Sequence, residues 1–447
     1  MSFDTVLHYL ELKGYAHFDG SKSDIHPNDL VEIIAELNAQ QKQELFLLLS
    51  EQDAATLIQE MEESEQVELI HLLTKERASA ILNEMDTDDA TDLLGELTSE
   101  EANELLALVE EETKEDIEDL MSYPADSAGG IMTTDYIAMA ENLTVAEAFV
   151  QLRKIAPSAE VVYYVYVVDS ENRLKGTLQL RDLISSRDDS LLLDIMRRNL
   201  ITVPVDMNQE KVAGVVSRYD LMAIPVTDND GCLLGVITVD DVLDVLEEET
   251  TEDILHMAGA GRVEGINIID IPIISLVKKR LPWLLIALFG GTLAGSVISA
   301  YETHLQSVIV LAVFIPMIMN MGGGVGTQSS TIAVRAIATG EMDLKIIWRY
   351  IVHELKVGAS LGFVNGVAIA IIATIWKGMP ALGLVIGLAT FVTLTVAALI
   401  GIMVPVCSVH LKIDPAMTAG PFVTTIKDIT ALLVYFGIAS LFIGYLV

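Results

Sequence analysis

Oxygen-bearing side chains lie close together near the carboxyl end of the chain, inside an otherwise apolar stretch. Thr424 and Thr425 supply hydroxyl groups and Asp428 a carboxylate, just after Gly420 and Pro421, which can free backbone carbonyls. A carboxylate in a membrane span costs about 2.5 to 3.5 kcal/mol unless it meets water, a partner or an ion. Such oxygens suit Mg²⁺, Ca²⁺ or Mn²⁺ rather than Zn²⁺ or Cu²⁺. The pattern indicates an ion pathway, with a structural ion pair as the alternative.

A second polar stretch, residues 315–331, interrupts an earlier apolar run. It contains Pro316, the amide of Asn320 and a cluster of glycines that includes Gly323 and Gly324. Proline removes a helical hydrogen bond, and irregular backbone at membrane depth is tolerated only where it is buried or lines water. We therefore expect a broken helix whose Asn320, Gly323 and Gly324 border the ion pathway. Close helix packing through small residues is the alternative.

Both polar stretches require helices that cross a bilayer. Five apolar runs of about 20 residues or more are long enough for this: 282–300, 303–334, 357–376, 378–411 and a last one from about 416. Lys and Arg concentrate on alternate connections, which places the amino terminus in the cytoplasm and, after five spans, the carboxyl terminus outside. No cleavable signal peptide is visible in residues 1–13. We predict a multi-pass protein of the plasma membrane.

Charge separates an acidic front from this apolar rear. Residues 1–128 hold 6 basic against 33 acidic side chains, residues 129–277 hold 11 against 25, and residues 278–447 hold 10 against 6. The front lacks the basic face that phosphate neutralisation needs, so nucleic-acid binding is disfavoured. Two cysteines are too few for a disulfide scaffold or a thiolate metal site. No nucleophile and base pair, phosphate loop or His-based metal motif is apparent, so we do not expect an enzyme.

A repeat organises the first 128 residues. Residues 51–61 resemble 75–85, and residues 66–73 resemble 90–97, both at an offset of 24. Short helices stacked as a small array account for this period. The acidic cluster Asp86, Asp88, Asp89 and Asp92 is denser than helix capping requires and is a candidate for weakly held, partly hydrated divalent cations. A solvated face is the alternative.

A second duplication follows, in which residues 165–184 recur as 224–243, 59 residues later. Each copy reads as strand, turn, strand and helix start. The pattern resembles a tandem pair of CBS domains, which implies an adenine nucleotide such as ATP. The family's ribose-contacting motif fits residues 235–241, so the resemblance implies a nucleotide site at Thr238 and Asp241. Gln179 replaces the threonine in the first copy. A purely structural CBS pair is the alternative.

An acidic helix is expected to link this pair to the membrane region. Positions 241, 244, 248 and 252 share one helical face, and no Lys or Arg occurs between Arg218 and Arg262. Like charges at this spacing destabilise a helix. We therefore expect the face to respond to cations.

The whole chain is similar to the MgtE family of magnesium channels and transporters. The resemblance rests on residues 123–132, on 320–323 with 326–329, and on 414–416, 420–422 and Asp428. It implies a homodimer with a pore on its two-fold axis, where Asp428 of each subunit faces hydrated Mg²⁺. It also implies that Mg²⁺ on the acidic cytosolic surfaces closes the pore and that ATP modulates this response. Gly324 departs from the Asn of many relatives.

The predicted fold is a multidomain membrane protein: an all-α helical-repeat N-domain (1–128), tandem α/β CBS domains (129–190 and 191–246), a connecting "plug" helix (247–277) and a five-span α-helical membrane domain (278–447). The predicted regulatory Mg²⁺ ligands are Asp88, Asp92, Asp220, Asp240, Asp241, Asp244, Glu249, Glu252 and Asp253. Two alternatives to a magnesium pathway stay open: a transporter of Co²⁺ or Mn²⁺, and a membrane-tethered CBS sensor that transports nothing.

Overall fold

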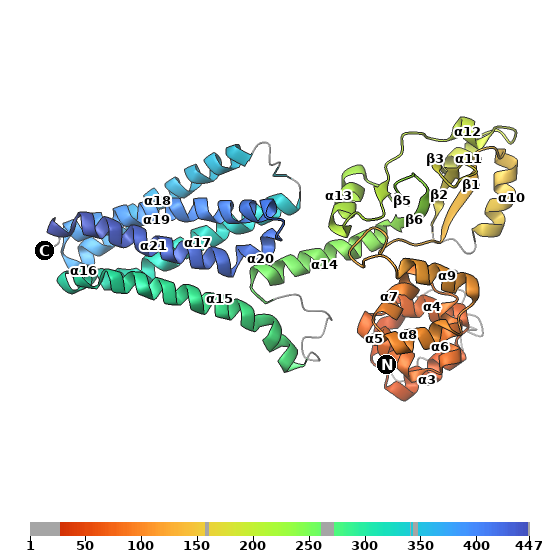
Figure 1. The fold of residues 1–447 in the computed structure, drawn as a ribbon, viewed down its shortest axis with the longest axis horizontal. Coiled ribbons are helices and arrows are strands. Elements are labelled where there is room, and N and C mark those ends of the chain that lie inside the picture. The colour runs from red at the N-terminus through yellow and green to blue at the C-terminus, as the bar shows by residue number, and fades with distance from the viewer. Residues whose placement is uncertain (1–26, 157–160, 261–271, 340, 343–346, 446–447) are drawn as a thin grey trace. The chain divides into compact units, whose positions relative to one another are not determined.

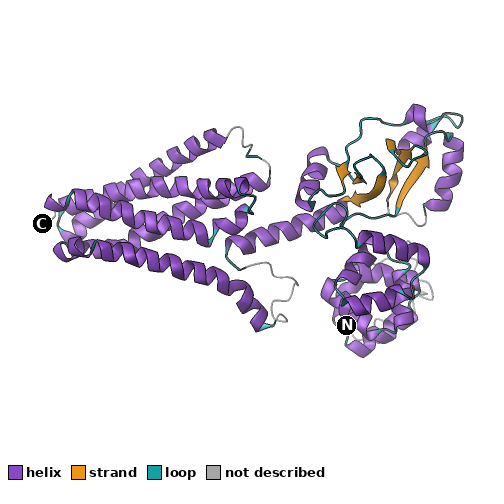
Figure 2. Cartoon of the chain, viewed as in Figure 1, coloured by secondary structure: helices purple, strands orange, loops and turns teal. Residues whose placement is uncertain are grey.

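The computed structural model describes residues 27–156, 161–260, 272–339, 341–342 and 347–445. The chain divides into two compact units, Met1–Glu247 and Glu248–Val447, which are described separately. Helices form nearly all of the second unit, whereas the first also contains strands (Figures 1 and 2). The signal-peptide prediction for residues 1–13 and part of the predicted plug helix, residues 261–271, lie outside the described residues.

Eight short helices form the front of the first unit. They are α2 (Pro27–Ala35), α3 (Ala39–Leu48), α4 (Glu51–Gln59), α5 (Glu63–Leu72), α6 (Lys75–Leu82), α7 (Thr87–Gly95), α8 (Ser99–Leu106) and α9 (Glu111–Leu120). Each packs against the helix two places along the chain, as α4 does on α6 and α5 on α7. Phe46, Ile58 and Ile81 are fully buried in their common core. The 24-residue repeat thus correctly predicted the stacking.

Two α/β modules follow, each with a three-stranded sheet. The first contains β1 (Tyr136–Ala140), α10 (Val145–Ile155), β2 (Val161–Val168), β3 (Leu174–Gln179), α11 (Leu180–Ser185) and α12 (Leu192–Ile195); the second contains β4 (Val203–Pro204), α13 (Gln209–Tyr219), β5 (Ala223–Thr227), β6 (Leu233–Thr238) and the start of α14 (Val239–Met257). In both sheets a parallel pair is followed by an antiparallel pair. Val167 pairs with Gly176, and Val226 with Gly235, so the 59-residue duplication extends to the strand register.

The second unit is an apolar helical bundle. It contains the end of α14, then α15 (Ile273–Ala300), α16 (Glu302–Ser307), α17 (Val310–Ala338), α18 (Ile347–Lys377), α19 (Pro380–His410), α20 (Pro415–Ala419), α21 (Pro421–Leu441) and the short η2 (Ile443–Tyr445). Five helical segments among the described residues, with α20 and α21 counted together, are long and apolar enough to cross a membrane. Helix α19 packs on α17, α18 and α21, and α15 packs on α21.

Glycines bring the backbones of α18 and α19 together. A Cβ at Gly362 would lie 2.6 Å from the carbonyl oxygen of Phe391, and one at Gly366 would lie 2.7 Å from that of Gly387. These distances are too short for any side chain. The two longest spans therefore meet through backbone, as small residues permit in membranes.

The expected break in the second span is wrong. Helix α17 runs without interruption from Val310 to Ala338, with Pro316 inside it. A membrane helix can absorb the one hydrogen bond that proline removes, because packing neighbours and small adjustments satisfy the freed group. The chain breaks instead at Gly420, whose φ of −84° and ψ of −102° separate α20 from α21.

Candidate functional site

Polar groups at the predicted ion pathway lie on two neighbouring helices. Helix α17 presents exposed Asn320 and Gly324, and α21, which packs against it, presents exposed Thr424 and half-buried Asp428. Among the described residues, no hydrogen bond or ion pair engages the Asp428 carboxylate. Exposed amide, hydroxyl and carboxylate groups within membrane spans are costly against lipid. This polar face of α17 and α21 therefore needs water, an ion or a second protein surface.

Thr425 and Gly323 lie behind that face. The Thr425 side chain packs against α15 so closely that a Cβ at Gly290 would lie 2.5 Å from its methyl carbon. Gly323 offers its carbonyl oxygen to Lys427, whose Nζ lies 2.8 Å away. Of the six predicted pathway residues, these two are thus engaged inside the bundle.

Lys427, which precedes Asp428 in the sequence, was not predicted as a residue of the site. Its side chain is 4% exposed, and its Nζ also donates to Thr327 Oγ1 at 2.9 Å. Adjacent residues on a helix point about 100° apart, which is why Lys427 reaches α17 while Asp428 does not follow it. The sequence does contain a signal for such a role, because Lys427 is a basic residue inside an apolar run.

A second group of carboxylates gathers in the first unit, where α7 and the preceding loop approach the start of α14. Asp86 and Asp89 both accept hydrogen bonds from Gln59 Nε2, each at 2.6 Å. Burial, opposed by the Gln59 hydrogen bond and aided by repulsion from Asp86 and Asp241, raises the pKa of Asp89 to about 7. Burial likewise raises the pKa of Asp86, with the charge of Asp240 adding to it.

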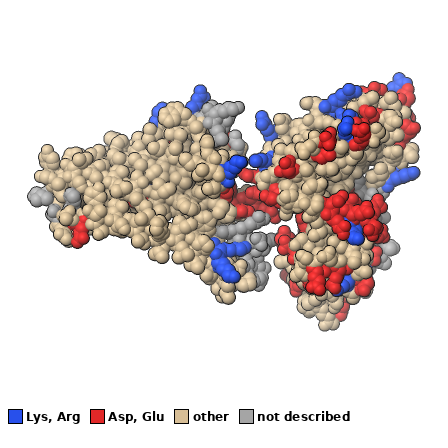
Figure 3. All heavy atoms as spheres, in the orientation of Figure 1, with Lys and Arg blue, Asp and Glu red and all other residues tan. Residues whose placement is uncertain are grey.

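We call Asp86, Asp89 and the aspartates at the start of α14 the acidic junction. The α14 aspartates also have raised pKa values. Burial raises the pKa of Asp241 to about 6, with Asp240 and Asp244 adding repulsion. Burial also raises the pKa of Asp244, where Asp240 is the strongest repelling charge. Figure 3 shows acidic side chains dense over this unit and few charges of either sign over the second. The junction is a concentration of negative charge that protons or cations would relieve.

Hydrogen bonds from Thr87 hold the helical front to the first α/β module. The backbone N–H of Thr87 donates to Asp135 Oδ2 at 3.1 Å, and Thr87 Oγ1 lies 2.9 Å from Thr134 Oγ1. Burial raises the pKa of Asp135, and the charge of Asp86 contributes. The contact thus places a further carboxylate, that of Asp135, near Asp86.

The predicted regulatory residues fall in several places. Asp88 is buried in α7 and Asp92 is exposed on it, while Asp220 ends α13 in a left-handed conformation, φ 52°. Asp240, Asp241 and Asp244 share the junction just described, whereas Glu249, Glu252 and Asp253 belong to the second unit. Within the described residues no preformed cluster of three or more His, Cys, Asp or Glu has metal-binding geometry. Asp86 and Asp89 belong to the acidic cluster that the sequence singled out, and the fold brings these two to the start of α14.

The end of α14 carries its own charged cluster in the second unit. Nδ1 of His256 lies 3.1 Å from Asp414 Oδ2, and Nε2 lies 3.6 Å from Glu252 Oε1. Burial raises the pKa of Asp253 to about 6, and the charges of Asp414 and Glu249 contribute. Glu252 and Asp253 therefore lie where α14 meets the start of α20.

The predicted nucleotide residues contact one another. Both the backbone N–H and the hydroxyl of Thr238 donate to Asp241 Oδ2, at 3.2 and 2.5 Å, at the start of α14. In the first module the N–H of Gln179 donates to Asp182 at 3.3 Å. A ribose would have to share or replace these bonds, and the nucleotide site stays a prediction.

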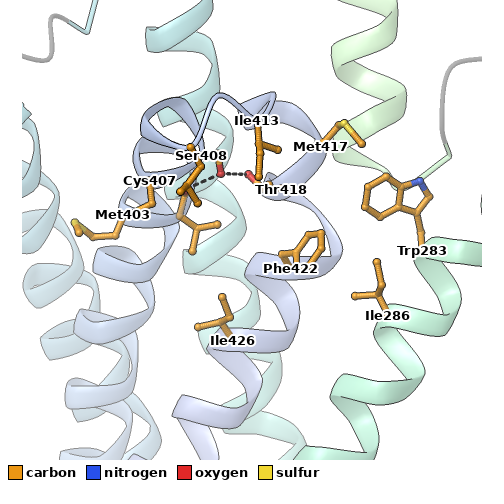
Figure 4. Close-up of a pocket in the computed structure, with 12 residues that line it drawn as sticks. Trp283, Ile286, Met403, Cys407, Ser408, Ile413, Met417, Thr418, Phe422 and Ile426 are labelled. Atoms are coloured by element: carbon orange, nitrogen blue, oxygen red, sulfur yellow. Dashed lines mark hydrogen bonds between the residues drawn. The ribbon is translucent and has the colours of Figure 1, made fainter.

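A hollow of about 580 Å³ opens between α15, α19 and the α20–α21 segment, and none of its lining residues is acidic. Trp283, Phe422, Ile426 and Met403 are among its lining residues (Figure 4). The hydroxyls of Ser408 and Thr418 bond each other at 2.7 Å. The hollow is largely apolar, and it shares no lining residue with the polar face of α17 and α21.

Comparison with known proteins finds matches over most of the chain. The family described as divalent cation transporter matches residues 315–438, the MgtE intracellular N domain matches 25–126, and the CBS domain matches 128–189 and 192–248. The magnesium transporter MgtE of Enterococcus faecalis is 42% identical over 75% of this chain and 73% of its own. That of Thermus thermophilus is 39% identical over 75% and 74%.

Solved structures agree for the first unit. A crystal structure of the soluble part of a magnesium transporter superposes with a TM-score of 0.52 at 36% identity, covering 55% of this chain and 97% of that one. The predicted fold class is confirmed: a helical N-domain and CBS pair precede a helical region with five candidate membrane spans. The relatives that share most of the chain are named magnesium transporters. On these matches and this architecture, the chain belongs to the MgtE family of magnesium transporters.

Proposed function

We propose that the protein conducts Mg²⁺ across the plasma membrane along the polar face of α17 and α21, as a homodimer with its amino terminus in the cytoplasm. The observation that carries this proposal is the Asp428 carboxylate, which lies within a membrane span without a hydrogen bond or ion pair among the described residues. Asn320, Gly324 and Thr424 extend the exposed polar surface beside it. A second copy facing this surface would exclude lipid and enclose a watery path.

The chemistry of Mg²⁺ fits such a path. The ion gives up water reluctantly and usually keeps several water molecules when one or two carboxylates hold it. Two Asp428 side chains facing each other would attract the hydrated ion without stripping it. Binding of this kind is strong enough for entry and weak enough for release, as conduction requires.

Regulation by cytosolic Mg²⁺ is supported by the acidic junction. Asp86, Asp89 and Asp241 are held together although their raised pKa values record a cost for doing so. Divalent cations at this junction offset the repulsion and favour the compact form, whereas low Mg²⁺ favours separation. Helix α14 runs on from the junction into the second unit, where His256 contacts Asp414 ahead of α21. We infer that this is the route by which Mg²⁺ closes the pore.

Three finer points belong to the same proposal. The other predicted ligands of the first unit, Asp88, Asp92, Asp220, Asp240 and Asp244, would hold hydrated Mg²⁺ there. Glu249, Glu252 and Asp253 would do so on the second half of α14. An adenine nucleotide at Thr238 would modulate the Mg²⁺ response through the start of that helix.

Ion flux into reconstituted vesicles tests the pathway. Asp428→Asn keeps the size of the side chain and removes its charge, so Mg²⁺ flux should fall at least about tenfold, the effect of a lost interaction of ~1.4 kcal/mol. Glu302→Gln is the matched control, because Glu302 is an exposed acid of the short α16. If Asp428→Asn conducted as well as Glu302→Gln, the pathway would be wrong. Flux of Co²⁺ and Mn²⁺ in the same vesicles separates a magnesium pathway from the two alternative cargoes, and no flux at all would favour the sensor.

Protease protection tests the regulation. We expect cleavage within residues 248–257 to slow between low and about 10 mM Mg²⁺, a level above the weak affinity of partly hydrated sites. Combined replacement of Asp86 and Asp89 by Asn should reduce this Mg²⁺ dependence. Identical cleavage at both Mg²⁺ levels in the unmodified protein would contradict the regulatory model.

A further inference from the structure

Lys427 makes an unusual contact across the membrane unit. Its Nζ donates to the carbonyl oxygen of Gly323 at 2.8 Å and to Thr327 Oγ1 at 2.9 Å, both on α17. Its side chain packs in the space next to Gly326, where a side chain on the glycine would crowd it: a Cβ at Gly326 would lie 3.0 Å from Cδ of Lys427. The lysine is 4% exposed, so its charge lies inside the helical bundle.

A space-filling role does not explain this lysine. Burying a cation without a directly bonded carboxylate is costly, and methionine would fill a similar volume at no such cost. Both of its acceptors, the Gly323 carbonyl and the Thr327 hydroxyl, are neutral. Its acidic neighbour in sequence, Asp428, interacts with it electrostatically but forms no hydrogen bond or ion pair with it among the described residues. The position of the charge must therefore matter more than the volume it fills.

The two acceptors belong to the helix that borders the proposed ion path. Gly323 directly precedes exposed Gly324, and Thr327 is itself an exposed residue of the same helix. Carbonyl and hydroxyl oxygens are the ligands that a cation recruits when it sheds water. With Lys427 in place, these two oxygens already face a positive charge.

We propose that Lys427 is a positioning and specificity-determining residue that withholds the Gly323 and Thr327 oxygens from passing cations, so that ions meet Asp428 through their own water. The inference rests on the proposed pathway past Asp428. Ca²⁺ binds six to eight oxygens in flexible geometry and accepts backbone carbonyls readily, whereas Mg²⁺ holds its water. Removing Lys427 would free ligands that favour Ca²⁺ over Mg²⁺.

The test is the ratio of Ca²⁺ to Mg²⁺ flux in vesicles containing the full chain. Lys427→Met removes the charge and both hydrogen bonds, and the ratio should rise about fivefold or more, the effect of ~1 kcal/mol of discrimination between two ions. Lys427→Arg keeps a cationic donor and should stay near the unmodified ratio. Lys377→Met is the matched control, because Lys377 ends α18 with its Nζ 4.4 Å from the centre of the Trp376 ring.

A merely structural role predicts a different result. Both fluxes would then fall together in Lys427→Met with the ratio unchanged, which would overturn the inference. If Lys427→Met does not fold, Lys427→Gln retains a polar donor in the span, and the same ratio decides. Loss of Mg²⁺ flux in Asp428→Asn with an unchanged ratio in Lys427→Met refutes only the role of Lys427. Undiminished flux in Asp428→Asn refutes the pathway itself.

Discussion

The imidazole of His256 joins the last turn of α14 to Asp414, with Nδ1 3.1 Å from Oδ2. Asp414 in turn accepts hydrogen bonds from the N–H groups of Ala416 and Met417 and so caps α20. Helix α20 leads through Gly420 directly into α21, which carries Asp428. A single side chain thus links the acidic connecting helix to the segment that begins the proposed ion path.

Replacing His256 should weaken regulation without removing transport. In His256→Ala the end of α14 loses its bond to the α20 cap, so the cytosolic Mg²⁺ concentration that halves flux should rise about fivefold, at the low end of typical coupling energies. His353→Ala, at an exposed position of α18, is the control. Flux measured against cytosolic Mg²⁺ gives the answer, and superimposable inhibition curves for the two variants would disprove the link.

Stability in Mg²⁺-free buffer should depend on pH through the acidic junction. The folded-state pKa values of Asp89 and Asp241, about 7 and about 6, lie above the ordinary value of 3.8. The folded state therefore binds more protons than the unfolded state between these limits, and the stabilisation present near pH 4 is lost as pH rises through 6 and 7. Thermal unfolding of the full chain should show a midpoint that falls from pH 5 to pH 8.

A substitution and added Mg²⁺ both serve as controls for this pH dependence. Asp89→Asn removes the most strongly shifted group, so its midpoint should vary less with pH and exceed that of the unmodified protein at pH 8. Saturating Mg²⁺ should flatten the unmodified curve in the same way, because a bound cation replaces the proton. An unfolding midpoint that rises with pH would contradict this reading of the junction.

Gly420 should not accept a side chain. A Cβ there would overlap the carbonyl oxygen of Met257, a backbone atom at the end of α14 that cannot rotate away. Gly420→Ala should therefore lower the free energy of unfolding by about 1 to 3 kcal/mol, or displace the end of α14, as overpacking does. Gly437→Ala is the matched control in α21, since a Cβ there meets nothing within 4 Å. Equal thermal midpoints for the two variants would show that the structure around Gly420 accommodates an added methyl group.

Arg77 should stabilise the helical front. Its guanidinium donates from Nη2 to the carbonyl oxygens of Phe46 and Leu49, at 3.1 and 2.6 Å, and so satisfies the end of α3. Arg77→Ala leaves these acceptors unpaired, and the expected loss is about 1.5 to 3 kcal/mol. Arg153→Ala, at an exposed site of α10, should change stability by less than about 0.5 kcal/mol. Denaturant unfolding of both variants measures the difference.

The sequence predicted best where one pattern constrained many residues at once. The 24-residue and 59-residue repeats predicted the helix stacking and the paired sheets, because similar segments fold alike and each copy supports the other. Mean hydropathy along the rear predicted five spans, because a bilayer requires long apolar helices. Such patterns average over single residues, so an atypical one does not spoil them.

Single positions were harder to predict, because their roles depend on neighbours far away in the chain. Pro316 suggested a broken helix, yet the packing of the bundle keeps α17 intact. Asp86 and Asp89 join α14 only through the fold of the first unit, which local sequence does not encode. The direction in which Lys427 leaves α21, and hence its contact with Gly323, likewise depends on how two helices are rotated against each other.

The glycine contacts between α18 and α19 limit which parts of the membrane unit can move. Where Gly362 meets the Phe391 carbonyl and Gly366 meets that of Gly387, one helix cannot slide past the other without a backbone collision. Helices α18 and α19 are therefore expected to move as one rigid body. Helix α17 is held to α19 in the same way, because a Cβ at Gly401 would lie 2.5 Å from the carbonyl oxygen of Gly326. Any opening must then come from α15 and from the α20–α21 segment, which carries Thr424 and Asp428.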